Sequence, residues 1–156
     1  MLFCKGMTEI LFYHLQGQKL EGVLTPLLEK SLERGWRIVV QGASEERIEA
    51  LDAHLWTYRD DTFLPHGTYR ESDVAAQPVL ITIHDHNPNA ANVRFLIDGV
   101  AMPADAASYQ RIVMLFDGTD ADAVAAARAH WASAKSSGFE VTYWQPDDAG
   151  RWQRKA

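Results

Sequence analysis

The sequence His84-Asp85-His86 is the densest group of side chains in this chain that could do chemistry. It closes an apolar run expected to be a strand, and imidazole and carboxylate groups at the carboxyl end of a strand can hold zinc. No third ligand pattern lies nearby in the sequence, however, so His54, His66 or His130 would have to converge on this cluster to complete a site. A solvated turn leading into Asn87-Pro88-Asn89 is the simpler interpretation. The alternative is a small metal-dependent α/β hydrolase using this cluster.

Other catalytic patterns are missing from the sequence. Gly17 and Gly22 follow the first expected strand, but they are five residues apart and do not form G-x-G-x-x-G, and no G-K-[ST] occurs. There is no G-x-S-x-G elbow, and Cys4 lies in a short N-terminal extension, where a nucleophile would be poorly placed. We therefore expect no catalytic constellation, no metal and no cofactor. A nucleotide-binding regulator that has lost its glycine loop is a third hypothesis.

A different chemistry, peptide recognition, is indicated by residues 121–137, an alanine-rich segment expected to be helical. Val124, Arg128, Trp131 and Lys135 follow one another at steps of four, three and four and form one stripe. Arginine can hold a carboxylate in a forked pair, tryptophan can pack an apolar side chain, and lysine can meet acidic neighbours. The stripe suits a peptide with a free C-terminal carboxylate, a bulky apolar last residue and acidic residues before it. The alternative is that Trp131 faces the sheet and the two cations are merely solvated.

Large aromatic residues also mark the segment 55–66. Trp56 and then Phe63-Leu64-Pro65-His66 flank the charged spacer Arg59-Asp60-Asp61, which places the segment near the surface. Aromatic side chains held at a surface usually contact a partner, because they carry much of the energy of protein interfaces. The alternative is that Trp56 and Phe63 cover the end of a helix and face the core.

The elements that must position these residues follow a β-α-β-α-β order. Apolar runs predict strands at 8–15, 36–40, 78–84, 92–97, 110–116 and 139–144. Helical spacing predicts helices at 20–34, 44–56 and 121–137; Gly35 and Gly138 end the first and last, and Thr119 or Asp120 caps the last. Crossover helices imply a largely parallel sheet flanked by helices, which gives one three-layer, Rossmann-like α/β domain over residues 8–145.

The two ends of the chain are expected to lie outside that domain. Residues 1–7 read as a disordered extension, with Met7 as an alternative start, and residues 146–156 as a polar, mobile tail. The composition otherwise fits one globular domain of 156 residues, with 47% hydrophobic and 23% charged residues. A single cysteine and the lack of a signal sequence or a long apolar run suit the cytoplasm. The net charge of −6 argues against sequence-independent DNA binding, so any link to DNA should run through another protein.

The motifs, taken in order along the chain, resemble the chi subunit of bacterial DNA polymerase III. The resemblance runs from about Thr8 to Trp144 and has three parts. They are Phe12-Tyr13-His14-Leu15, Leu55-Trp56 with Phe63-Leu64-Pro65-His66, and Ala127-Arg128-Ala129-His130-Trp131 with Lys135-Ser136-Ser137-Gly138-Phe139. The resemblance implies a non-catalytic replisome adaptor, an accessory subunit that brings no chemistry of its own.

The resemblance also implies two partners. Chi subunits bind the acidic, phenylalanine-terminated tail of single-stranded-DNA-binding protein on the last helix, which implies Arg128 and Trp131 in the tail site. Val124 and Ala132 stand where lysine can occur in the family, so we expect weaker tail binding; Arg151, Arg154 and Lys155 could compensate if the chain end folds back. The aromatic segment is similar to the surface that docks the psi subunit of the clamp loader or an accessory helicase. This implies Trp56, Phe63, Pro65 and His66 in that surface, with Leu55 in the core.

Overall fold

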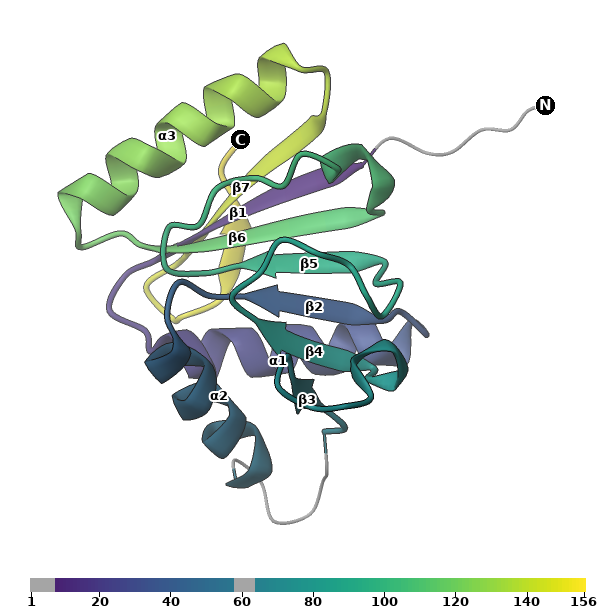
Figure 1. Cartoon of the computed structure of the whole chain (residues 1–156). Coiled ribbons are helices and arrows are strands. Elements are labelled where there is room, and N and C mark those ends of the chain that lie inside the picture. Colours follow the sequence, from purple (N-terminus) through teal and green to yellow (C-terminus); the bar gives the residue numbers. More distant parts are fainter. Residues whose placement is uncertain (1–7, 58–63) are drawn as a thin grey trace.

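Residues 8–57 and 64–156 are described by the computed structural model; the predicted extension 1–7 and the candidate residue Phe63 lie outside them. The strands are β1 (Glu9–Leu15), β2 (Ile38–Gln41), β3 (Gly67–Thr68), β4 (Val79–Thr82), β5 (Val93–Leu96), β6 (Arg111–Asp117), β7 (Glu140–Pro146) and β8 (Trp152–Arg154). The α-helices are α1 (Leu20–Glu33), α2 (Glu45–Thr57) and α3 (Ala121–Ser136), and the short 3-10 helices are η1 (Val74–Ala76) and η2 (Ala106–Ser108). The strands form one eight-stranded sheet in the order β3-β4-β2-β5-β6-β1-β7-β8 (Figure 1).

The sheet is largely parallel, as the alternation of strands and helices predicts. Neighbouring strands run parallel throughout, except that β8 runs antiparallel to β7. The central strands β2, β4 and β5 are buried along their whole length, because helices or loops cover both faces of the sheet. This explains why these segments read in the sequence as short continuous apolar runs. The predicted α/β class with one largely parallel sheet is confirmed.

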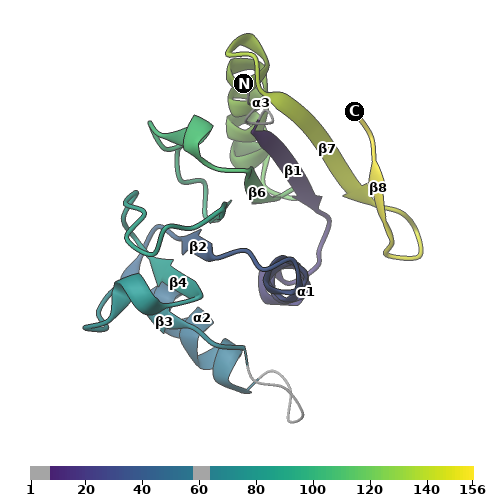
Figure 2. The ribbon, with the colours of Figure 1, turned by 90° about the vertical axis from the view of Figure 1, so that its right-hand side faces the viewer.

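The helices lie on both faces of the sheet, and strand β1 contributes side chains to the core on each face. Successive side chains of β1 point to opposite faces of the sheet. Leu11, Tyr13 and Leu15 pack with α1 and α2 in one core cluster, whereas Ile10 and Phe12 pack with α3 in the other. Figure 2 shows α1 and α3 on opposite sides of the sheet. Helix α3 therefore covers this face together with the segment around η2, which packs in the same cluster through Ala106 and Tyr109.

The helix ends follow local signals in the sequence. Gly35 and Gly138 adopt φ angles of 79° and 87° just beyond α1 and α3, a region that suits glycine at a helix end. Asp120 caps α3, because its Oδ1 accepts hydrogen bonds from the backbone N–H groups of Asp122 and Ala123 at 3.0 and 3.4 Å. The three predicted helices are confirmed within one or two residues at each end.

The end of the chain departs from the sequence analysis, because the predicted mobile tail folds back as strand β8. Asp147 accepts hydrogen bonds from the backbone N–H groups of Ala149 and Arg151, and this turn reverses the chain. Trp152 then packs on Tyr13 with ring centroids 4.9 Å apart, which brings apolar area to the edge of the core. The short strand β3 was also absent from the prediction. No helix among the described residues is long and apolar enough to cross a membrane.

Candidate functional site

Helix α3 lies on the sheet through its small residues. Ala127 and Ala134 are buried against the strands, and Val124 and Trp131 pack beside them half-buried. Alanine at these positions lets the helix approach the sheet closely, so the larger side chains of the stripe emerge at its border. The stripe predicted from the sequence therefore forms one edge of the contact between α3 and β7.

Trp131 combines the two roles that the sequence left open. Its ring meets Phe12 and Tyr143 edge-on, with centroids 5.6 and 5.8 Å apart, so one side of the indole faces the sheet. The rest of the side chain stays accessible, and the Lys135 ammonium lies 5.3 Å from the ring centroid. The structure thus offers a fixed aromatic surface with an exposed cation beside it.

Arg128 is exposed on the same edge of α3 and makes no ion pair with a carboxylate in the described part of the chain. Its charge acts on His14 of β1 and Tyr143 of β7, lowering the pKa of each. Arg128 lies one turn before Trp131, which packs on Tyr143 of β7, so the two side chains lie along the same edge of α3. An unpaired guanidinium next to a half-buried aromatic ring is an arrangement suited to a carboxylate with an apolar neighbour.

Three polar side chains meet on β1 and β7, on the face of the sheet that α3 covers, and the sequence analysis did not identify them as site residues. His14 Nδ1 lies 2.5 Å from the Tyr143 hydroxyl and 3.3 Å from Gln145 Nε2, and the imidazole packs on Phe116. Both neighbours can donate to Nδ1, which fits a neutral imidazole that carries its proton on Nε2. The signal in the sequence was a polar residue on the apolar, α3-facing side of β1.

The pKa of the His14 imidazole lies below its ordinary value, chiefly because burial disfavours the charged ring and secondarily because Arg128 repels it. Asp117, at the end of β6, partly offsets these effects. Burial raises the pKa of the Tyr143 hydroxyl, while Gln145 and Arg128 lower it. At neutral pH both groups are therefore uncharged, and the charges that act on His14 come from Arg128 and Asp117.

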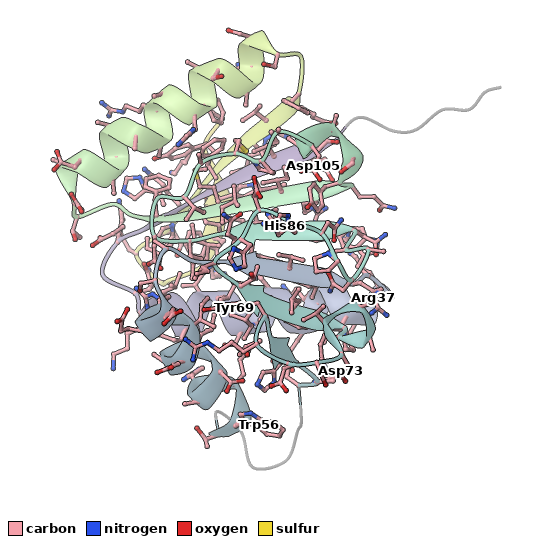
Figure 3. The ribbon with its side chains drawn as sticks, in the orientation of Figure 1. Arg37, Trp56, Tyr69, Asp73, His86 and Asp105 are labelled. Carbon is pink, nitrogen blue, oxygen red and sulfur yellow. The ribbon has the colours of Figure 1, made fainter. Side chains whose placement is uncertain are left out.

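The second predicted surface lies at the opposite end of the molecule, where Figure 3 shows Trp56 at the end of α2. Trp56 is 57% exposed and is the only large hydrophobic side chain that is exposed among residues 8–57 and 64–156. Leu55 before it is buried, as expected, and Pro65 is half-buried. Trp56 therefore lies at the surface and does not face the core, while Phe63 lies outside the described residues.

His66 is placed differently from its neighbours in the motif, because its side chain is entirely buried. Its Nδ1 lies 2.7 Å from the carbonyl oxygen of Leu64, its Nε2 lies 2.9 Å from Asp52 Oδ1, and its ring lies 5.0 Å from that of Trp56. It thus ties the chain after the aromatic segment to α2. His66 can influence a partner only through the residues that it holds in place.

Comparison with known proteins decides the family. The family model described as DNA polymerase III chi subunit, HolC, matches residues 7–142. The chain belongs to the DNA polymerase III chi subunit family. A curated relative, the probable DNA polymerase III subunit chi of Rickettsia prowazekii (strain Madrid E), is 28% identical over 123 residues, which cover 72% of each chain. Chi is an accessory subunit of DNA polymerase III and not a catalytic one, so this chain has an accessory role in replication.

The histidine loop of this chi-family chain has a structural explanation. His84 and His86 are exposed after β4, and the carbonyl oxygens of both accept hydrogen bonds from the buried Arg94 guanidinium, at 2.6 and 3.0 Å. His54 and His130 lie on α2 and α3, and no group of three potential ligands that could hold a metal ion occurs among the described residues. The metal-dependent hydrolase therefore has no ligand set in that part of the chain.

A cavity of about 710 Å³ lies at the carboxyl ends of β1 and β6, where a nucleotide would bind in many α/β proteins. Arg47 is the one arginine on its wall, and its guanidinium pairs with Glu21 at 3.4 Å and Asp98 at 3.0 Å. The other charged residues there are mostly aspartates. Such a wall would repel phosphates, so nothing in the cavity supports the nucleotide-binding hypothesis.

Replacing Gly118 by alanine is expected to lower the free energy of unfolding by about 1–3 kcal/mol. A Cβ atom there would lie 1.9 Å from His14 Nε2 and 2.6 Å from the backbone oxygen of Leu15, so both the imidazole and the turn must move. Urea denaturation measures the loss. Gly22→Ala is the matched control, because a Cβ there meets nothing within 4 Å and helix α1 should gain stability. Equal stability of Gly118→Ala and the unmodified chain would contradict the close approach.

Proposed function

We propose that this chi-family chain is a non-catalytic adaptor that binds the acidic C-terminal tail of single-stranded-DNA-binding protein and links it to the clamp loader. The tail would lie along Val124, Arg128, Trp131 and Lys135 on α3. The observation that carries the proposal is the exposed Arg128, which pairs with no carboxylate of residues 8–57 and 64–156 and lies one turn from the half-buried Trp131 ring. Contact with DNA would be indirect, in agreement with the net charge of −6.

Each part of such a tail has a complementary group on the stripe. The terminal carboxylate can pair with the Arg128 guanidinium, and a phenyl ring can pack on the accessible side of Trp131 and on Val124. Acidic residues earlier in the tail can meet Lys135, which is exposed beside the indole. The carboxylate and ring contacts are close and directional, whereas the contacts of the acidic residues are exposed and should weaken with salt.

Strand β8 brings one further cation to the edge of the sheet beside β7. The backbone N–H of Lys155 donates to the carbonyl oxygen of Tyr143, so Lys155 lies directly beside β7. By the alternation of strand residues, Lys155 shares the α3 face with Tyr143, while Arg154 shares the opposite face with Trp144. Of the three basic residues at the chain end, Lys155 is the one placed to compensate for the neutral Val124 and Ala132.

The test is a fluorescence-anisotropy titration with a labelled acidic peptide that ends in Pro-Phe with a free carboxylate. Arg128→Ala should weaken binding about tenfold or more, because a hydrogen-bonded charge pair contributes about 1.5–3 kcal/mol. Trp131→Ala should weaken it similarly, and its folding is checked by urea denaturation because the indole also packs on Phe12. Arg34→Ala, an exposed arginine at the end of α1, is the matched control and should bind normally.

Salt and the carboxylate itself provide the remaining controls. Moderate salt should weaken binding by the unmodified chain, and a C-terminal amide peptide should bind much more weakly than the free carboxylate. No saturable binding by the folded, unmodified chain would overturn the tail site. Binding that is insensitive to both Arg128→Ala and Trp131→Ala would place the peptide elsewhere.

We also propose that the segment around Trp56 docks the second partner, which is the psi subunit of the clamp loader or an accessory helicase. Support comes from the exposure of Trp56 at the end of α2 and from the buried His66, which ties the chain after the half-buried Pro65 to Asp52 of the same helix. Phe63 completes the proposed set. Because this surface and the α3 stripe lie at opposite ends of the sheet, both partners could bind at once (Figure 3).

A further inference from the structure

The polar cluster of His14, Tyr143 and Gln145 sits on the face of the sheet that α3 covers, at the border next to Arg128. On β1, Ile10 and Phe12 fill this face with apolar atoms, and His14 is the next side chain on the same side. Tyr143 pairs in register with Phe12, which places its hydroxyl group beside the imidazole. The cluster therefore continues the surface of Trp131 from α3 onto the strands.

The chemistry of the cluster is that of an incomplete anion site. Tyr143 and Gln145 bring hydrogen-bond donors, His14 can gain one by protonation, and Arg128 brings a full positive charge. All three strand residues are half-buried rather than enclosed, so a ligand can reach them.

We propose that His14, with Tyr143 and Gln145, forms the second half of the carboxylate site opposite Arg128, and that His14 takes up a proton when a C-terminal carboxylate binds. The inference rests on the proposed binding of a carboxylate-terminated peptide to α3 and adds the strand residues that recognise the carboxylate. Two oxygens can then be satisfied from two sides, by the guanidinium from α3 and by the imidazolium from β1. A C-terminal amide is uncharged, so it would gain no ion pair with either the guanidinium or the imidazolium.

The groups that face His14 determine the direction in which carboxylate binding changes its pKa. Before binding, burial and Arg128 hold the pKa of His14 below its ordinary value, and only Asp117 of β6 opposes them. Tyr143 of β7 is uncharged, because burial raises its pKa. A bound carboxylate neutralises the charge of Arg128 and adds a negative charge beside the ring, and both effects raise the pKa of His14. Affinity for the carboxylate must therefore rise as the pH falls through the range in which the ring titrates.

The test compares peptide binding at about pH 8 and about pH 5.5, where the terminal carboxylate stays ionised. The unmodified chain should bind the labelled Pro-Phe peptide about tenfold more tightly at the lower pH, since one unit of pKa shift corresponds to a factor of ten. His14→Gln keeps a hydrogen-bonding side chain but cannot titrate, so its affinity should match that of the unmodified chain at the higher pH and change little with pH. The C-terminal amide peptide should show no such pH dependence with either chain.

A second measurement does not depend on a variant that folds. In an NMR titration of the imidazole signals, the pKa of His14 should rise when the unmodified chain is saturated with the free-carboxylate peptide and should not rise with the C-terminal amide peptide. Tight binding with the same pH dependence in the unmodified chain and His14→Gln, or an unchanged titration of His14, would overturn this inference and leave the tail site standing. No peptide binding at any pH would overturn both.

Discussion

Replacing Arg94 by methionine is expected to lower the free energy of unfolding by about 3 kcal/mol or more. Arg94 lies in the middle of β5 with none of its surface exposed. Methionine fills a similar volume but offers no hydrogen-bond donor. A loss of this size is a large share of the stability of an ordinary domain.

The reason is the number of acceptors that depend on the Arg94 guanidinium. Gln41 Oε1 accepts from Nε and Nη2 at 3.1 and 2.6 Å, and the Tyr109 hydroxyl lies 3.0 Å from Nη1. The carbonyl oxygens of His84 and His86 complete the set. None of these partners is a carboxylate. Because each buried acceptor left without a donor costs about 1–3 kcal/mol, even partial hydration after the substitution leaves a large deficit.

Urea denaturation followed by circular dichroism measures the effect. Arg111→Met on the neighbouring strand β6 is the matched control, because Arg111 is partly exposed and its ion pair with Glu9, at 3.0 Å, should contribute about 1 kcal/mol at most. Amide hydrogen exchange should also become faster in the loop after β4 in Arg94→Met. Equal losses in the two variants would mean that the Arg94 contacts contribute no more than a surface ion pair.

The fold could be predicted where the decisive interactions are local. Asp120 caps α3 through the next residues of the chain, and Gly35 and Gly138 end helices through their own backbone angles. Strand β8 was missed because its stability comes from distant parts of the chain, namely the pairing with β7 and the contact of Trp152 with Tyr13. The turn that Asp147 caps was a signal for a reversal of the chain, but a turn alone does not say which edge the next strand joins.

In the candidate site, too, the features that depend on local spacing could be predicted and those that depend on distant parts of the chain could not. Helical spacing placed Val124, Arg128, Trp131 and Lys135 on one edge of α3, because a period of 3.6 residues needs no knowledge of the rest of the fold. It could not tell that Trp131 would both pack on the sheet and remain accessible. His14 was visible only as part of a strand, since its partners come from β7 and α3. The burial of His66 was likewise invisible, because Asp52 and Leu64 create it only once the chain has folded.

Replacing Trp56 by alanine is expected to weaken binding of the psi subunit or accessory helicase about 30-fold or more, while the free energy of unfolding falls by only about 1 kcal/mol. Trp56 is 57% exposed, so its truncation removes the contact with the His66 ring but less packing than the truncation of a core residue. In a complex the indole could become buried in a pocket of the partner, and anchors of this type typically contribute about 2 kcal/mol or more. The difference between a large loss of binding and a small loss of stability is what separates an interface residue from a core residue.

Calorimetric titration of the purified partner into the unmodified chain and Trp56→Ala provides the measurement, with urea denaturation to verify the fold. Arg128→Ala is the matched control. This variant should bind the psi subunit or accessory helicase normally but should lose binding of the tail peptide. Trp56→Ala should in turn keep the tail peptide. If Trp56→Ala bound the partner as tightly as the unmodified chain, the exposed indole would not be the anchor. If each variant lost both ligands, the two surfaces would be coupled, whereas their separation on opposite ends of the sheet predicts that an adaptor holds its two partners independently.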